Sequence, residues 1–69
     1  MMAAMATAGQ TLRIERLRAN LTATAVAAQM GLSRQSLWVI ERAARVKPER
    51  VVAYRAAVKT LSDDTEDVA

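Results

Sequence analysis

The sequence predicts an all-α fold, a compact domain of four or five helices that contains a helix-turn-helix. The apolar 52% of the chain is built almost entirely from Ala, Val, Leu, Ile and Met, with no Phe. This composition, with two Gly and one Pro, favours closely packed helices over strands. Apolar residues also recur at helical spacing between residues that cap helices. Each helix can therefore be assigned in order along the chain.

The first helix is expected from residue 10 to residue 19, after a flexible N-terminus of residues 1–9. Leu12 and Leu17 supply apolar positions along it, and arginines lie between them. Asn20 follows where the chain must turn, because Asn tolerates the left-handed conformation better than most residues. These residues place the end of the first helix just before Asn20.

A helix-turn-helix is predicted over residues 22–42 from spacing alone. Thr22 is a good N-cap for a short helix whose inward side carries Val26, Ala27 and Met30. Gly31 ends that helix, since a glycine can take a positive φ without the cost of a Cβ. Ser33 is the next N-cap, so only a tight turn separates the two helices.

The third helix, residues 34–42, separates into two faces on a wheel of 100° per residue. Leu37 and Ile40 share the inward side with Ala44. The outward arc carries Gln35, Trp38, Val39 and Arg42, with Arg34 at its edge. Side chains on this arc are the candidates for binding.

A fourth helix is predicted to begin at Pro48, whose missing N–H is harmless in a first turn. Its apolar positions at near-helical spacing are Val51, Val52, Tyr54, Ala57, Val58 and Leu61. Residues 62–69 are acidic and polar, and are expected to form a disordered tail. The predicted domain therefore spans residues 10–61.

Charge is divided unevenly along the chain. All ten Lys and Arg lie between Arg13 and Lys59 with only three acids, a net charge of +7 for that segment, and the other four acids follow Leu61. A basic body predicts a polyanionic partner, although arginines that merely solvate helix surfaces are an equal alternative from charge alone.

Several classes of function are disfavoured by composition. The chain has no Cys and no His, which removes thiolate and imidazole metal ligands, disulfides and the usual general base. No phosphate-binding Gly loop or paired catalytic carboxylate is present. We therefore expect no enzyme, no metal, no cofactor and no small-molecule ligand. The first residues lack a basic segment and a long apolar run, so a cytoplasmic protein without a membrane contact is expected.

The stretch "LTATAVAAQMGLSRQSLWVIERAARVKP" resembles, without gaps, the DNA-binding domains of the lambda-repressor-like group, the Cro/CI or XRE-type regulators. The matching positions are Leu21, Thr22, Ala27, Gly31, Ser33, Leu37, the "IER" of residues 40–42, and Pro48. The resemblance covers about residues 10–61. It implies that the third helix enters the major groove of double-stranded DNA, usually as a homodimer on a palindromic operator.

The resemblance also implies residue roles. Arg34 and Gln35 match positions that reach base edges, where Arg can bond guanine and Gln can bond adenine. Arg16 and Glu41 match an ion pair that ties the first helix to the third. Positions that match phosphate contacts or caps are Thr22, Ser33, Ser36, Arg42 and Lys47.

Three departures from the family pattern stand out. Ala23 replaces a Gln that usually braces the start of the second helix, and Ala43 replaces a Gly after the third, which predicts a longer helix or roughly 1 kcal/mol of strain. Trp38 and Val39 are apolar where the outer face is usually polar. They are assigned to base contacts through thymine methyl groups, or to the sugar–phosphate wall.

Trp38 leaves two other interpretations open, a place in the core and an anchor for a protein partner.

The leading function is a sequence-specific transcriptional regulator, a small repressor of phage or mobile-element origin that acts by operator occupancy. The alternative is a protein-binding module on the same fold, an antirepressor or antitoxin-like partner that uses Trp38 and Val39. A structural nucleoid protein is a weaker third option.

Overall fold

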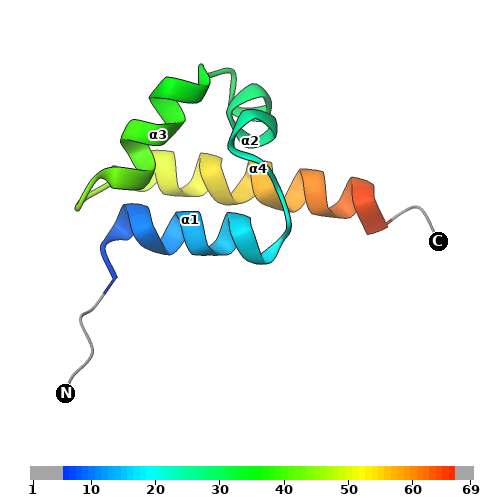
Figure 1. Cartoon of the computed structure of the whole chain (residues 1–69), viewed down its shortest axis with the longest axis horizontal. Helices are drawn as coiled ribbons and strands as arrows, with labels where there is room; N and C mark the ends of the chain where they lie inside the picture. The colour runs from blue at the N-terminus through cyan, green and yellow to red at the C-terminus, as the bar shows by residue number, and fades with distance from the viewer. Residues whose placement is uncertain (1–5, 67–69) are drawn as a thin grey trace.

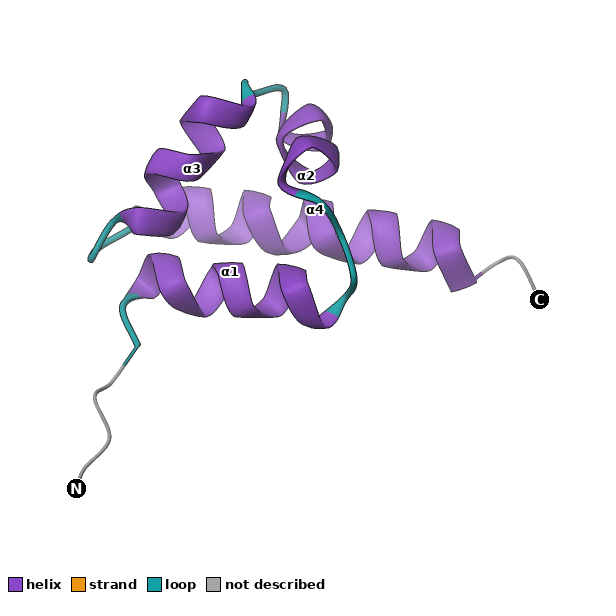
Figure 2. Cartoon of the chain, in the orientation of Figure 1, coloured by secondary structure: helices purple, strands orange, loops and turns teal. Residues whose placement is uncertain are grey.

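The protein is described by a computed structural model that covers residues 6–66. Its element order is α1 (Ala8–Arg18), α2 (Ala23–Met30), α3 (Arg34–Arg42) and α4 (Pro48–Glu66). All regular structure in this part of the chain is helical (Figures 1 and 2), which confirms the all-α prediction with four helices. In Figure 1, α1 and α4 run lengthwise, and α2 and α3 lie across them on one side.

Helix α1 begins two residues earlier than the sequence analysis predicted. The Thr7 hydroxyl accepts a hydrogen bond from the Gln10 backbone N–H at 3.2 Å, and the Gln10 side chain accepts one from the Thr7 N–H at 3.1 Å. This capping box satisfies two donors that would otherwise be unpaired. Residues 7–9 thus belong to the folded domain, and residues 1–5 lie outside the described part. At the other end, Asn20 takes the expected positive φ of 64°.

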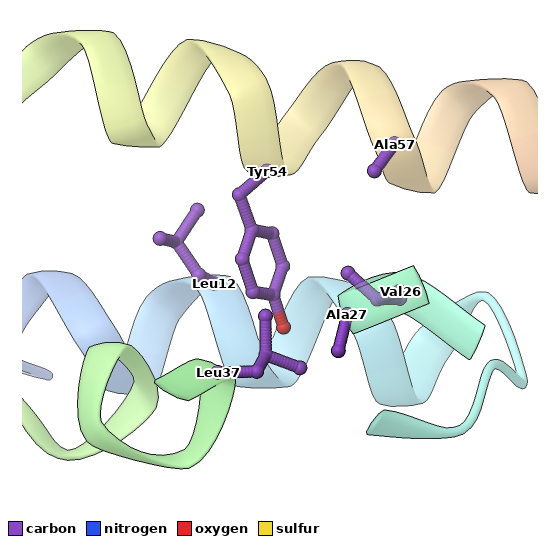
Figure 3. Packing of buried hydrophobic residues seen from close by; sticks show 6 residues of the cluster. All are labelled: Leu12, Val26, Ala27, Leu37, Tyr54 and Ala57. Atoms are coloured by element: carbon purple, nitrogen blue, oxygen red, sulfur yellow. The ribbon is translucent and has the colours of Figure 1, made fainter. Parts of the chain in front are cut away.

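The core lies where all four helices meet. Its buried members are Leu12, Val26, Ala27, Leu37, Tyr54 and Ala57. Figure 3 shows the Tyr54 ring pointing from α4 toward Leu12 and Leu37. Tyr54 is the largest side chain in this core, so α4 contributes much of the buried area. Met30 and Ile40, expected to face inward, are half-buried against the core, and Val52 is 68% exposed.

Gly9 joins the start of α1 to the end of α3. Its backbone N–H donates to the Ala43 carbonyl at 3.1 Å, and the Ala8 N–H donates to the Ala44 carbonyl at 3.3 Å. A Cβ on Gly9 would lie 2.6 Å from the carbonyl oxygens of Glu41 and Ala43, and would also meet that of Ile40. Only glycine therefore permits the backbones of α1 and α3 to approach this closely.

Ala43 ends α3 in a way that corrects the expected strain. It adopts an extended conformation with φ −75° and ψ 139°, so the left-handed residue typical of the family is not needed here. The carbonyls of Ala43 and Ala44 are instead satisfied by the first N–H groups of α1. Alanine at this position carries no backbone strain, and α3 ends at Arg42 as predicted.

Helix α4 continues to Glu66, which corrects the predicted disordered tail for residues 62–66. The segment after Leu61 contains neither Gly nor Pro, and each residue added to an existing helix gains a backbone hydrogen bond without a new nucleation step. Its acidic composition opposes the helix dipole but does not end the helix. Residues 67–69 of the predicted tail lie outside the described part.

Candidate nucleic-acid interface

The turn between α2 and α3 has the predicted geometry. Thr22 caps α2 by accepting a hydrogen bond from the Ala25 N–H at 3.1 Å. Gly31 takes a φ of 72°, and the Leu32 N–H closes the turn on the Ala27 carbonyl at 2.8 Å. Ser33 then caps α3. This glycine-centred closure fixes the direction in which α3 leaves α2.

The two faces of α3 match the helical wheel. Leu37 is fully buried and Glu41 is 5% exposed, whereas Trp38 is 54% and Val39 57% exposed. The other outward residues, Arg34, Gln35, Ser36 and Arg42, are also exposed. The exposure of Trp38 excludes the interpretation that it is a core residue. The inward side packs α3 against the core, and the outward side is exposed and available to bind a partner.

Trp38 and Arg42 contact each other one turn apart. The guanidinium carbon of Arg42 lies 4.5 Å from the centroid of the Trp38 ring, within the range of a cation–π interaction. This contact orients both side chains. The sequence analysis placed both residues on one arc but did not predict this pairing, although their i, i+4 spacing permits it.

The residues predicted to contact phosphates include helix caps and a residue of the loop before α4. Thr22 and Ser33 are N-caps, and Ser33 accepts from the Ser36 N–H at 3.1 Å and donates to the Ser36 hydroxyl at 3.0 Å. Within residues 6–66 the first two backbone N–H groups of α2 and α3 have no hydrogen-bond acceptor. Lys47 is exposed in the loop before Pro48, and its carbonyl accepts from the N–H groups of Arg50 and Val51.

Glu41 lies at the centre of a buried hydrogen-bond network. Its carboxylate accepts from Arg16 Nε at 2.7 Å, from Arg16 Nη2 at 3.1 Å and from the Tyr54 hydroxyl at 2.5 Å. Arg16 also donates to the Leu21 carbonyl at 3.0 Å. The predicted ion pair is therefore present, and Tyr54, which was assigned only to the apolar pattern of α4, extends it. This network, Arg16–Glu41–Tyr54, joins α1, α3 and α4.

Each group in the network stabilises the ionisation state of the others. Burial alone would raise the pKa of Glu41, but the hydrogen bonds from Arg16 and Tyr54 favour the carboxylate and hold its pKa below the ordinary value of 4.5. Burial, together with the hydrogen bond to Glu41, raises the pKa of Tyr54. The hydrogen bond to Glu41 raises the pKa of Arg16.

The lowered pKa of Glu41 predicts a loss of stability in acid. Its contribution is present above the unfolded value of 4.5 and is lost as the pH falls through the lower folded value. Thermal unfolding is followed by circular dichroism from neutral pH downward. The midpoint temperature should fall once the pH is below the unfolded value of 4.5. Glu41→Gln should flatten this acid limb. Glu15→Gln is the matched control, because Glu15 forms an exposed pair with Arg55 and should barely alter the profile. Parallel acid limbs for wild type and Glu41→Gln would contradict the assignment.

Two hollows follow opposite sides of α3. The α1–α3 hollow has a volume of about 400 Å³, and the α3–α4 hollow one of about 280 Å³. The first is lined by Thr7, Gln10, Arg13, Trp38, Glu41 and Arg42. The second is lined by Leu32, Ser36, Val39, Ile40 and Arg50. Gln35 lines neither hollow and lies on the ridge between them. Arg13 was missed by the sequence analysis, because its position beside α3 depends on how the helices pack.

Among the side chains that the structure describes, no group of three or more acidic residues is placed to hold a metal ion. No helix within residues 6–66 is both long and apolar enough to cross a membrane.

Comparison with known proteins identifies the family. A family model described as a helix-turn-helix domain matches residues 7–68. No curated protein and no solved structure matches the chain. The match covers nearly the whole chain and includes Thr7, the cap of α1. A helix-turn-helix domain is a DNA-binding unit. The four helices, the glycine turn and the family match together show that the chain belongs to the helix-turn-helix domain family, as the resemblance to lambda-repressor-like regulators implied.

Proposed function

We propose that the protein is a sequence-specific transcriptional regulator, a small repressor of the Cro/CI kind from a phage or mobile element. It acts by occupying its operator and excluding the polymerase. The observation that carries the proposal is the exposed outer face of α3 on a helix anchored from within by Leu37 and Glu41. A site held this way on a rigid element keeps the geometry that base recognition requires.

Base recognition is assigned to the first two turns of α3. Arg34 would bond the O6 and N7 of guanine, and Gln35 the N6 and N7 of adenine. Val39 is 57% exposed and offers an apolar surface to a thymine methyl group. Trp38, also predicted to contact bases, lies toward the α1 side of the helix and lines the α1–α3 hollow.

Phosphate binding is assigned to residues at the edges of the helix-turn-helix. Thr22 and Ser33 cap α2 and α3, and the first two N–H groups of each helix, which the caps leave unpaired, favour an anion through the helix dipoles. Ser36, Arg42 and Lys47 would add hydrogen bonds and charge. Because Ser33 and Ser36 already bond each other, their contribution requires sharing or reorientation of a hydroxyl.

A homodimer on a palindromic operator completes the proposal, with the protein in the cytoplasm and associated with the nucleoid. The fourth helix is the proposed dimer surface, since Val52 is 68% exposed. Val51 and Val58 are only half-buried, whereas Tyr54 is buried and is not available to an interface. A two-fold pair of domains would place one α3 in each half-site.

The proposal predicts that Gln35→Ala reduces discrimination between DNA sequences. A preferred site is first selected from a pool of random duplexes, and the affinities for that site and for its single-base variants are then measured at fixed salt. Loss of the adenine contact should remove about 1–3 kcal/mol of discrimination at one base pair in each half-site.

Gln29→Ala is the matched control, because Gln29 is an exposed glutamine on α2 that lines a hollow against α4, away from α3. It should leave the preference intact. An unchanged preference in Gln35→Ala would show that the base-reading residues of α3 are assigned wrongly.

The exposed pair Trp38 and Val39 supports a second candidate, a module that binds another regulator rather than DNA. In that case neither selected nor random duplex would bind the wild-type protein measurably. Replacement of Trp38 and Val39 would then abolish capture of the protein partner while DNA had no effect.

A further inference from the structure

Trp38 lines a hollow beside α3 together with residues of α1. The α1–α3 hollow is flanked by α3 on one side and by the first turns of α1 on the other. Two arginines contribute to its lining, Arg13 from α1 and Arg42 from α3, and both are exposed. The indole N–H of Trp38 has no acceptor within residues 6–66. The hollow thus combines two cations, one free donor and one flat apolar surface.

The negative charge in the lining is already compensated. Glu41 is 5% exposed, and both of its oxygens accept hydrogen bonds within the Arg16–Glu41–Tyr54 network. The backbone of α1 does not contribute donors either. The N–H groups of Ala8, Gly9 and Gln10 are bonded to Ala44, Ala43 and Thr7. An anion in this hollow would therefore be bound by side chains, chiefly Arg13 and Arg42.

The shape of DNA identifies the anion. The major groove is about 12 Å wide, and a helix with its side chains is about 10–12 Å across, so a helix in the groove nearly fills it. The two strands' backbones then lie along the two sides of that helix. Arg13 belongs to α1, beside α3 rather than on it, so it faces the side of the groove and not the base edges that α3 meets. A backbone that ran along the α1 side of α3 would pass over the hollow that Arg13 lines.

We propose that the α1–α3 hollow seats the sugar–phosphate backbone of one DNA strand, with phosphates between Arg13 and Arg42 and a deoxyribose against the Trp38 ring. This inference rests on the proposed function and refines it. Trp38 binds the backbone rather than the bases, and the cation–π contact with Arg42 orients both side chains before DNA binds. Binding of the DNA backbone in this hollow does not depend on the base sequence.

Salt titration tests the proposal without any knowledge of the operator. A labelled random-sequence duplex of about two helical turns is titrated by fluorescence anisotropy at several salt concentrations. Wild type, Arg13→Gln and Lys59→Gln are compared. The two variants remove the same charge, and Lys59 is exposed on α4, away from both hollows. Circular dichroism checks that each variant is folded.

Arg13→Gln should reduce the slope of log K against log salt by about 0.9, the value for one phosphate contact. Lys59→Gln should leave the slope at the wild-type value. Trp38→Ala should weaken binding to random duplex and to a selected site by the same factor. Equal slopes for Arg13→Gln and Lys59→Gln, or a loss in Trp38→Ala confined to the selected site, would overturn this proposal and leave the proposed function standing. Failure of the wild type to bind any duplex would instead overturn the proposed function, and this inference with it.

Discussion

Replacement of Glu41 by alanine is expected to destabilise the domain by about 3–5 kcal/mol, the typical cost of breaking a buried ion pair from one side. The change leaves the Arg16 guanidinium and the Tyr54 hydroxyl buried without their acceptor. The folded part of the chain is shorter than 70 residues, and small domains are marginally stable, so few kilocalories of stability can be lost. Urea unfolding followed by circular dichroism measures the loss, and most of the variant should be unfolded in buffer.

Two further variants separate the charge from the hydrogen bonds. Tyr54→Phe removes only one donor and should cost about 1–3 kcal/mol. A triple replacement, Arg16→Met, Glu41→Leu and Tyr54→Phe, removes every polar member together and should recover much of the stability lost in Glu41→Ala. A Glu41→Ala variant within about 1 kcal/mol of wild type would show that the network does not hold the helices together.

Gly9→Ala is the second large effect, a predicted loss of about 1–3 kcal/mol through overpacking. The new Cβ would meet three backbone carbonyl oxygens at the end of α3, and backbone atoms cannot swing aside as a flexible side chain can. The loss would occur although alanine favours a helix by about 1 kcal/mol over glycine. Thermal and urea unfolding measure it, and DNA affinity should fall as well, because α3 must shift.

Gly31 provides the contrast for Gly9. A Cβ there has open space around it, but the φ of 72° disfavours most side chains. Gly31→Asn should therefore be tolerated well, because Asn visits the left-handed region. If Gly9→Ala proved as stable as Gly31→Asn, the close approach of α1 and α3 would not be essential to the fold.

Local features of the fold were predictable because local chemistry determines them. Thr22 and Ser33 cap helices, and Gly31 and Asn20 take positive φ, each within a few residues of the pattern that indicates it. The end of α4 is not predictable from composition, because an acidic, polar segment is typical of disorder, while a helix already formed extends at little cost. The start of α1 was missed although the Thr7 to Gln10 spacing of a capping box was visible.

The features that sequence reasoning could not supply all join distant segments. Gly9 matters only because the end of α3 packs against it, and the strain expected at Ala43 disappears for the same reason. Tyr54 fits an apolar helical pattern, and nothing in that pattern indicates that its hydroxyl reaches Glu41. The outward arc of α3 was predictable from the helical spacing of its apolar residues. Which residues of that arc line each hollow, and which lie between the hollows, depends on the packing of α1 and α4 against α3.

The chain contains one Trp and one Tyr, and the fold places them in opposite environments. Trp38 is half-exposed on the outer side of α3, so its emission reports what approaches that surface. Tyr54 is fully buried beside Glu41, so the absorbance change of its phenol on ionisation should appear only as the core opens at high pH. The unmodified protein thus has two optical reporters, one for binding and one for unfolding, and the two events can be followed separately in a single sample.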